Sequence, residues 1–322
     1  MPRKVAVTLR EKKEIDPESP VTAHIYGDTI EISTALGGTP IMKKLNRDEM
    51  VNRVTGEITE VHHITSRADP KNYESLRSTF KRLKRLIGAN FKGGYSELWV
   101  TLTYKDSPMT DSKRLYIDFK RMMRRLRRIT RKRKELAYIV VIEPQASGSL
   151  HAHLLLKTID HSRLYIPNKK LAEAWGQGFV NVKRLSEADN VASYVMAYVS
   201  DVDLNNLEGQ LENNEKLPKR IVKGGRLALY PIGMQIYRRS RHGIKDPIKI
   251  KGMKKTIKSK YHIDDAVPDY YRKFDIKRKS GEDPFEIETE YYSRKRAKLA
   301  AAIAKINRSC QNSCSEDAEV AD

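Results

Sequence analysis

The chain has 322 residues, of which 39% are hydrophobic, so it can build one large domain or two domains with an ordinary core. Its formal net charge of +21 favours a polyanionic partner, above all nucleic acid, although a basic chain can also bind anionic membranes or simply stay soluble. The two cysteines, Cys310 and Cys314, exclude a disulfide framework and a four-cysteine zinc site. The start lacks a signal-peptide pattern and no apolar run could span a membrane, so we expect a soluble, cytoplasmic protein.

Residues 1–20 are rich in charge and are predicted to form a flexible leader. Residues 21–94 form an N-terminal extension, in which 21–34 and 56–66 alternate in the manner of strands. A helix is predicted over 72–94, because apolar residues recur there at helical spacing. Its apolar stripe consists of Leu76, Phe80, Leu83 and Ile87.

Residues 95–250 are predicted to form the central domain, and 95–202 show a regular succession of elements. In chain order these are a strand (97–104), a helix (111–136), two strands (137–143 and 149–157), a helix (168–175), a strand (178–185) and a helix (186–201). The β-α-β-β-α-β-α order predicts an α+β fold of the split βαβ type, as in ferredoxin-like and RRM-like domains. Its antiparallel sheet would carry helices on one face.

The C-terminal part is less regular. Residues 230–247 are a candidate further strand of the central domain. Residues 251–308 are predicted to form a basic arm followed by a closing helix, which would begin at Phe285, and 309–322 are predicted to be a disordered tail. The stretch 250–285 has tyrosines among its basic residues but little periodicity, which is typical of an arm or linker.

Two histidines lie one residue apart in the apolar run "SLHAHLLL". Because residues i and i+2 of a strand share a face, His151 and His153 are about 6 to 7 Å apart at Cα and point the same way. Glu143 ends the preceding strand and becomes a cross-strand neighbour through the tight turn between them. Such a His-His-Glu set suits a catalytic Mg²⁺, Mn²⁺ or Zn²⁺, and the alternative is a hydrogen-bonded structural pair.

Two tyrosines in "YVMAY" are the candidate nucleophiles. Tyr194 and Tyr198 are i and i+4 on the predicted helix, so both hydroxyls can approach one point. A tyrosine can attack phosphorus when a metal activates the phosphoryl group, and the ester it forms conserves the energy of the broken bond. The alternative is ordinary packing.

The helix over 111–136 carries a nearly single-sign charge run, which favours contact with phosphates over a merely solvated face. Trp175, Tyr104 and the tyrosines after residue 260 can also stack on unpaired bases, and the sequence singles out none of them. The candidate DNA-binding residues on this helix and the strand over 178–185 are Arg121, Arg124, Arg125, Arg128, Lys183 and Arg184.

The order "LWVTLTY", "GSLHAHLLL", "WGQGFVNVKR", "YVMAY" resembles the HUH endonucleases, in particular the two-tyrosine rolling-circle replication initiators of phages and plasmids. The resemblance covers residues 95–202. It implies that His151 and His153, with Glu143, hold a divalent metal (Mg²⁺ or Mn²⁺), and that Tyr198 and Tyr194 are the nucleophiles. The family often has a lysine near these tyrosines. Ala197 and Asp201 stand there in this sequence, and Lys183 or Arg184 is the candidate substitute.

The resemblance further implies nicking of single-stranded DNA at a replication origin, with a 5′-phosphotyrosine and a free 3′-OH as products. The expected partners are this DNA and the polymerase and helicase of a bacterial host, and no membrane is expected. No GxxxxGK[ST] loop indicates an appended helicase. Two alternatives stay open, namely an HUH-type single-strand transposase and a non-catalytic basic nucleic-acid-binding protein.

Overall fold

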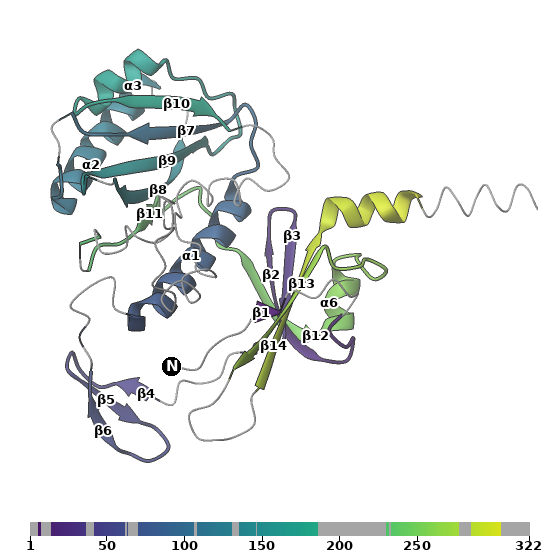
Figure 1. Cartoon of the computed structure of the whole chain (residues 1–322). Coiled ribbons are helices and arrows are strands. Elements are labelled where there is room, and N and C mark those ends of the chain that lie inside the picture. The colour runs from purple at the N-terminus through teal and green to yellow at the C-terminus, as the bar shows by residue number, and fades with distance from the viewer. Residues whose placement is uncertain are drawn as a thin grey trace, which may run out of the picture. The chain divides into compact units, whose positions relative to one another are not determined.

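The chain divides into two compact units, of which one consists of Met1–Gly38 with Pro247–Asp322 (unit 1) and the other of Thr39–Asp246 (unit 2). Figure 1 shows the elements of both units in the computed structural model. No helix within the part of the chain that is described is long and apolar enough to cross a membrane. The structure describes residues 6–7, 14–36, 42–61, 63, 70–105, 108–130, 135–145, 147–185, 230–231, 233–276 and 285–303.

Unit 2 is built on a five-stranded antiparallel sheet with the order β10-β7-β9-β8-β11. Counted in chain order, the first four strands read 4-1-3-2 across the sheet, which is the split βαβ arrangement. The predicted α+β fold is therefore confirmed, and the candidate strand within 230–247 is β11 at the sheet edge. The strands are β7 (Glu97–Leu102), β8 (Leu136–Pro144), β9 (Leu150–Thr158), β10 (Val180–Arg184) and β11 (Tyr237–Arg239).

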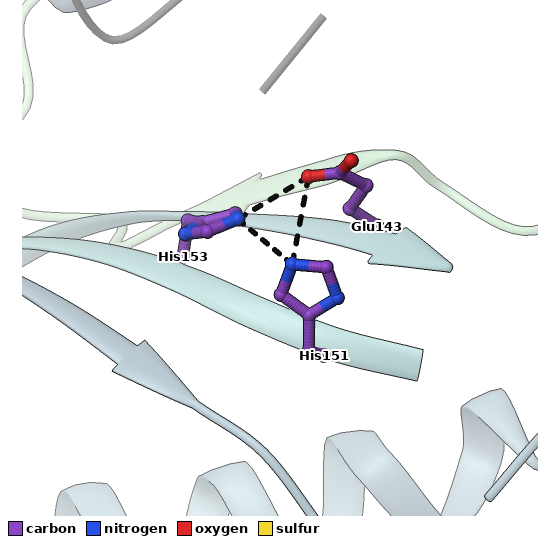
Figure 2. A group of neighbouring side chains, drawn as sticks. All are labelled: Glu143, His151 and His153. Atoms are coloured by element: carbon purple, nitrogen blue, oxygen red, sulfur yellow. Dashed lines mark hydrogen bonds and ion pairs between the residues drawn. The ribbon is translucent and has the colours of Figure 1, made fainter. Parts of the chain in front are cut away.

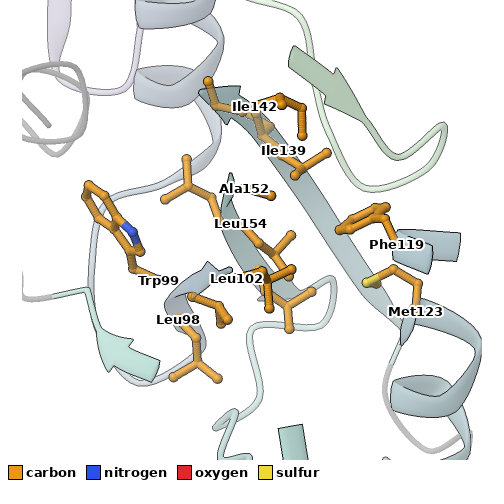
Figure 3. Close-up of a cluster of buried hydrophobic side chains, with 14 of the residues drawn as sticks. Leu98, Trp99, Leu102, Phe119, Met123, Ile139, Ile142, Ala152 and Leu154 are labelled. Atoms are coloured by element: carbon orange, nitrogen blue, oxygen red, sulfur yellow. The ribbon is translucent and has the colours of Figure 1, made fainter. Parts of the chain in front are cut away.

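Two helices cover one face of this sheet, α2 (Ser112–Ile129) and α3 (Asn168–Trp175). Asp111 caps α2 by accepting hydrogen bonds from the first free backbone N–H groups of the helix. Phe119 of α2 packs edge-on against Tyr138 of β8, with ring centroids 5.1 Å apart. Figure 3 shows Phe119 and Met123 of α2 in the cluster of buried side chains that also contains Leu154 of the sheet. The predicted apolar stripe is buried except at Ile129, which is 37% exposed where the helix ends, earlier than predicted. The buried members of the predicted stripe are Leu115, Phe119, Met122 and Leu126.

The helix of the N-terminal extension, α1 (Pro70–Asn90), belongs to the same core as the sheet. Phe80, Leu83 and Ile87 of its predicted stripe are buried. At its end, the Asn90 backbone carbonyl accepts a hydrogen bond from Lys157 Nζ at 3.1 Å. Lys157 lies on the side of β9 that alternation places opposite Leu154 and Leu156, so α1 reaches the face that α2 and α3 leave open.

A small three-stranded sheet precedes α1 in the chain, with the order β4-β5-β6. Its strands are short and contain no buried residue, and the strand predicted over 56–66 is confirmed for Ile58–Glu60. The three strands are β4 (Met42–Lys44), β5 (Glu49–Asn52) and β6 (Ile58–Glu60).

Unit 1 is a second antiparallel sheet, with the order β1-β13-β14-β3-β2-β12. The sequence predicts an arm over 250–285 and a helix from Phe285, and both predictions are wrong here. Residues 285–293 are a strand because their charged and apolar residues alternate, and the helix comprises 294–303. The elements are β1 (Ala6–Val7), β2 (Pro20–Tyr26), β3 (Thr29–Ser33), β12 (Ile248–Met253), α6 (Lys254–Lys260), β13 (Tyr270–Ile276) and β14 (Phe285–Ser293).

A buried ion pair in unit 1 joins an N-terminal segment of the chain to segments near the C-terminus. Lys254 Nζ lies 3.0 Å from Glu290 Oε1 and donates to the backbone oxygen of Ile15 at 2.5 Å. The N–H of Ile15 donates to the same carboxylate at 2.6 Å. Ile15 is fully buried, so the flexible leader predicted over residues 1–20 is wrong for 14–20.

Replacing Lys254 by methionine is expected to lower the free energy of unfolding by about 3 kcal/mol, because Glu290 then stays buried without its cation. Urea unfolding of the full chain measures this loss. Lys255→Met is the matched control, since Lys255 is exposed and pairs with Glu18 at the surface, where removal costs below about 1 kcal/mol. Equal losses in both variants would contradict the role given to the buried pair.

Candidate metal centre

The hairpin of β8 and β9 brings the predicted metal ligands together. Its register pairs Glu143 with His151 and Val141 with His153. Since alternate residues of a strand share a face, Glu143, His151 and His153 all lie on one face. Tyr138, which packs on α2, lies on the other, so the three ligands are on the face opposite α2. The predicted cross-strand position of Glu143 is confirmed.

The three side chains converge on one point, as Figure 2 shows. His151 Nε2 and His153 Nε2 are 2.9 Å apart, and Glu143 Oε2 lies 3.5 Å from the first and 3.2 Å from the second. All three residues are largely shielded from solvent. The apolar neighbours in β9 are buried, so the backbone beneath the imidazole rings is held rigidly.

This arrangement fits a divalent cation. Metal–ligand bonds of about 2.0 to 2.2 Å place neighbouring ligand atoms roughly 3 to 3.5 Å apart, close to the three separations found here. Imidazole nitrogens and a carboxylate oxygen are all electron-pair donors, and a cation between them satisfies all three at once. The cluster therefore has the ligand chemistry and the spacing of a candidate metal site.

Two residues of β7 support His153 and were missed by reasoning from the sequence. Thr101 pairs with His153 across β7 and β9, and its hydroxyl lies 3.4 Å from His153 Nδ1. Trp99 packs edge-on against the same ring, with centroids 5.8 Å apart. A hydrogen bond at Nδ1 fixes the tautomer that leaves Nε2 free to bind a metal. The "TLTY" motif contains Thr101, but its contact with His153 depends on the order of the strands.

Replacing Thr101 by valine is expected to weaken Mn²⁺ binding about 10- to 100-fold, because His153 loses the partner that orients its ring. Titration calorimetry with Mn²⁺ measures the change, with melting curves to confirm folding. Thr158→Val is the control, since this change also removes a hydroxyl hydrogen bond, in this case to the Ser162 carbonyl at the far end of β9. The same weakening in both variants would argue against orientation of His153 by Thr101.

The candidate nucleophiles Tyr194 and Tyr198, and the helix predicted over 186–201, lie outside the residues that the structure describes. Their roles stay predictions. In the sequence, both tyrosines follow β10, which carries Lys183 and Arg184.

The basic candidates are not gathered at the metal centre. Those on α2 lie on the opposite face of the sheet, because α2 buries its apolar stripe on that face. Arg121 pairs with Asp118 at 3.3 Å, and Arg125 donates to the Ala174 carbonyl at 3.0 Å, so both also have structural partners. Arg124 and Arg128 are exposed.

Lys183 shares the face of the histidines, because it pairs with Trp99 across β10 and β7. Arg184 pairs with Leu98 and points to the other face, where its guanidinium lies over the Tyr95 ring at 5.2 Å from the centroid. Of the six basic candidates, Lys183 is thus the one on the side of the metal centre.

The aromatic pair Tyr104 and Trp175 is part of the core. Trp175 is 1% exposed and donates its ring N–H to the Thr103 carbonyl at 2.8 Å. Tyr104 packs edge-on against Trp175 and donates its hydroxyl to Asp118. Burial, assisted by the Asp118 carboxylate, raises the pKa of Tyr104 above its usual range. The prediction that these rings stack on unpaired bases is wrong for Trp175, which is buried, and stays a prediction for Tyr104, which is partly buried.

Comparison with known proteins connects this site to DNA replication. Residues 97–203 match the family model of replication-associated protein ORF2/G2P. The matched segment begins with β7, includes the whole ligand set, and ends just beyond Tyr198. The match covers about a third of the chain, so this segment is similar to replication-associated proteins. No curated protein and no solved structure matches the chain significantly.

Proposed function

We propose that the protein initiates rolling-circle DNA replication by nicking single-stranded origin DNA, as a site-specific endonuclease and strand transferase of the HUH type. The observation that carries this proposal is the convergence of Glu143, His151 and His153 inside the segment that matches the replication-associated family. Tyr194 and Tyr198 follow in the same segment, at the spacing that two alternating nucleophiles need.

The three ligands would hold one Mg²⁺ or Mn²⁺, which supplies Lewis-acid polarisation of a phosphoryl oxygen when bound. The phenol oxygen of Tyr198 or Tyr194 attacks the scissile phosphorus as its proton passes to water. The bond from phosphorus to the 3′ oxygen breaks, and that oxygen takes up a proton as a free 3′-OH. The 5′ phosphate remains on the tyrosine. The second tyrosine can later attack the regenerated origin in the same way, and the 3′-OH freed by this cleavage attacks the first phosphotyrosine, which closes the circular strand and releases the first phenol.

The free 3′-OH would prime the DNA polymerase of a bacterial host, with a host helicase opening the duplex, in the cytoplasm. Lys183 lies on the metal-centre face and is a candidate to neutralise the scissile phosphate in place of the lysine that related sequences often carry near the tyrosines. The net charge of +21 supports a polyanionic substrate of this kind.

The two competing functions are less well supported. A single-strand transposase would use the same chemistry, but the matched family is one of replication-associated proteins. A non-catalytic RRM-like protein stacks bases on exposed aromatic residues of its central strands. On the described central strands β7 and β9, the aromatic residue on the histidine face is Trp99, which is 8% exposed.

Incubation of the wild-type chain with a labelled single-stranded origin oligonucleotide and Mn²⁺ tests the proposal. We expect a shortened product and a covalent protein–DNA adduct, and neither in the presence of EDTA. Candidate origins come from tiling the replicon that encodes the chain. Adduct formation that is unaffected by EDTA would reject the metal-assisted mechanism, and cleavage without an adduct would reject tyrosine attack.

A further inference from the structure

A second candidate binding site lies on the helix side of the unit 2 sheet. A surface pocket of about 270 Å³ opens between α2 and β8. Because α2 covers the face opposite Glu143, His151 and His153, this pocket is separate from the metal centre. Its lining residues are Phe119, Lys120, Met123, Arg124, Arg127 and Tyr138.

The floor of the pocket is aromatic and apolar. Phe119 and Tyr138 meet edge to face at an interplanar angle of 70°, and the thioether side chain of Met123 lies beside them. Flat rings and a polarisable sulfur favour a planar ring as ligand. The volume is near the lower end for ligand pockets, about 300 Å³, so it suits one small ring system. A nucleobase has this shape and this size class.

The rim of the pocket is cationic. Lys120, Arg124 and Arg127 are exposed and follow one another at one helical turn along α2. Arg127 and Arg238 both lie close enough to the Tyr138 phenol to act on it electrostatically. Within the part of the chain that is described, the residues that line the pocket include no carboxylate. A surface that only needs to be solvated would mix charges of both signs, whereas this rim is complementary to phosphates on either side of a bound base.

We infer that this pocket binds one unpaired base of single-stranded DNA, with the flanking phosphates on Lys120, Arg124 and Arg127. The inference goes beyond nicking, since it places a metal-independent contact on the face away from the cleaved phosphodiester. A strand long enough to reach both faces would be held at two points, which raises its affinity by effective concentration. Aromatic stacking combined with a basic groove is the general mode of single-strand recognition.

Fluorescence anisotropy of the full chain with a labelled oligothymidine of about fifteen nucleotides, in EDTA, tests the site. The double variant Arg124→Glu and Arg127→Glu is expected to bind at least about tenfold more weakly than a control with the same charge change. Its salt dependence should fall by about 0.7 per lost phosphate contact. The control is Lys113→Glu with Lys170→Glu, which alters exposed cations of α2 and α3 outside the pocket. Equal weakening by both pairs, or none by the first, would overturn the inference.

Two further measurements identify the occupant. In the pocket variant, the affinity for duplex DNA of the same length should fall less than the affinity for the single strand. An equal fall would assign the surface to the backbone of duplex DNA instead. Photocrosslinking of wild-type protein to oligonucleotides containing 5-iodouracil should label Tyr138 or Phe119, and labelling elsewhere alone would also overturn the inference. Failure of the nicking proposal is distinguishable, because the His151→Ala, His153→Ala variant should keep this binding while it loses cleavage.

Discussion

A variant with His151→Ala and His153→Ala is expected to lose origin nicking by at least about 10³-fold while it still binds single-stranded DNA. Removing both imidazoles leaves Glu143 as a single ligand, which cannot hold a divalent ion at micromolar concentration. The several kcal/mol of transition-state stabilisation that the ion supplies are then lost, and each 1.36 kcal/mol is about a factor of ten in rate. Initial nicking rates across a Mn²⁺ titration give the loss.

Binding of single-stranded DNA is the internal comparison for nicking, because the basic residues of the protein can contact DNA without the metal. His242→Ala is the matched control, since His242 is exposed in the same unit and is not part of the cluster. Melting curves would show that β9 still folds without its imidazoles. Wild-type nicking rates in the double variant would reject Glu143, His151 and His153 as the metal centre.

Replacing Tyr194 and Tyr198 together by phenylalanine is expected to abolish the covalent adduct completely, while Mn²⁺ affinity stays unchanged. Phenylalanine keeps the ring but lacks the hydroxyl oxygen that forms the bond to phosphorus. Another group could form this bond only in a different geometry. Denaturing gels of protein with labelled oligonucleotide detect the adduct. Each single variant then shows which tyrosine attacks first, and we expect Tyr198→Phe to have the larger effect.

Tyr165→Phe is the control for this prediction, because Tyr165 is an exposed tyrosine of the same unit. Mass spectrometry of the nucleotide-linked peptide locates the attached residue independently. An adduct that persists in the Tyr194→Phe, Tyr198→Phe variant would show that another residue is the nucleophile, while leaving the metal centre intact.

Sequence reasoning succeeded for unit 2 because its elements are ordered along the chain. From β7 to β10, consecutive strands are joined by a tight turn or by a single helix. Local periodicity is therefore enough to predict the fold of this segment. Unit 1 was missed for the opposite reason. Its sheet pairs β2 and β3 with β12 and β14, which are more than two hundred residues away, and nothing local in residues 250–285 indicates those partners. Residues 285–293 alternate with period two, but the basic helical pattern that follows them led to the prediction of a helix over the whole segment.

By itself, the sequence determined the candidate metal ligands, which are His151 and His153 at strand spacing and Glu143 on the other side of a tight turn. Its positive net charge also favours a polyanionic partner. These follow from local rules, since a strand of period two and a tight hairpin leave the three ligands no other face. The tertiary structure decided which residues support and flank the site. Strand order placed Thr101 and Trp99 against His153, and it placed Lys183 on the same face of the sheet. The apolar stripe of α2 packs on the opposite face, so the arginines of this helix lie there too. Such contacts join segments that are distant in sequence, and only the packed sheet determines them.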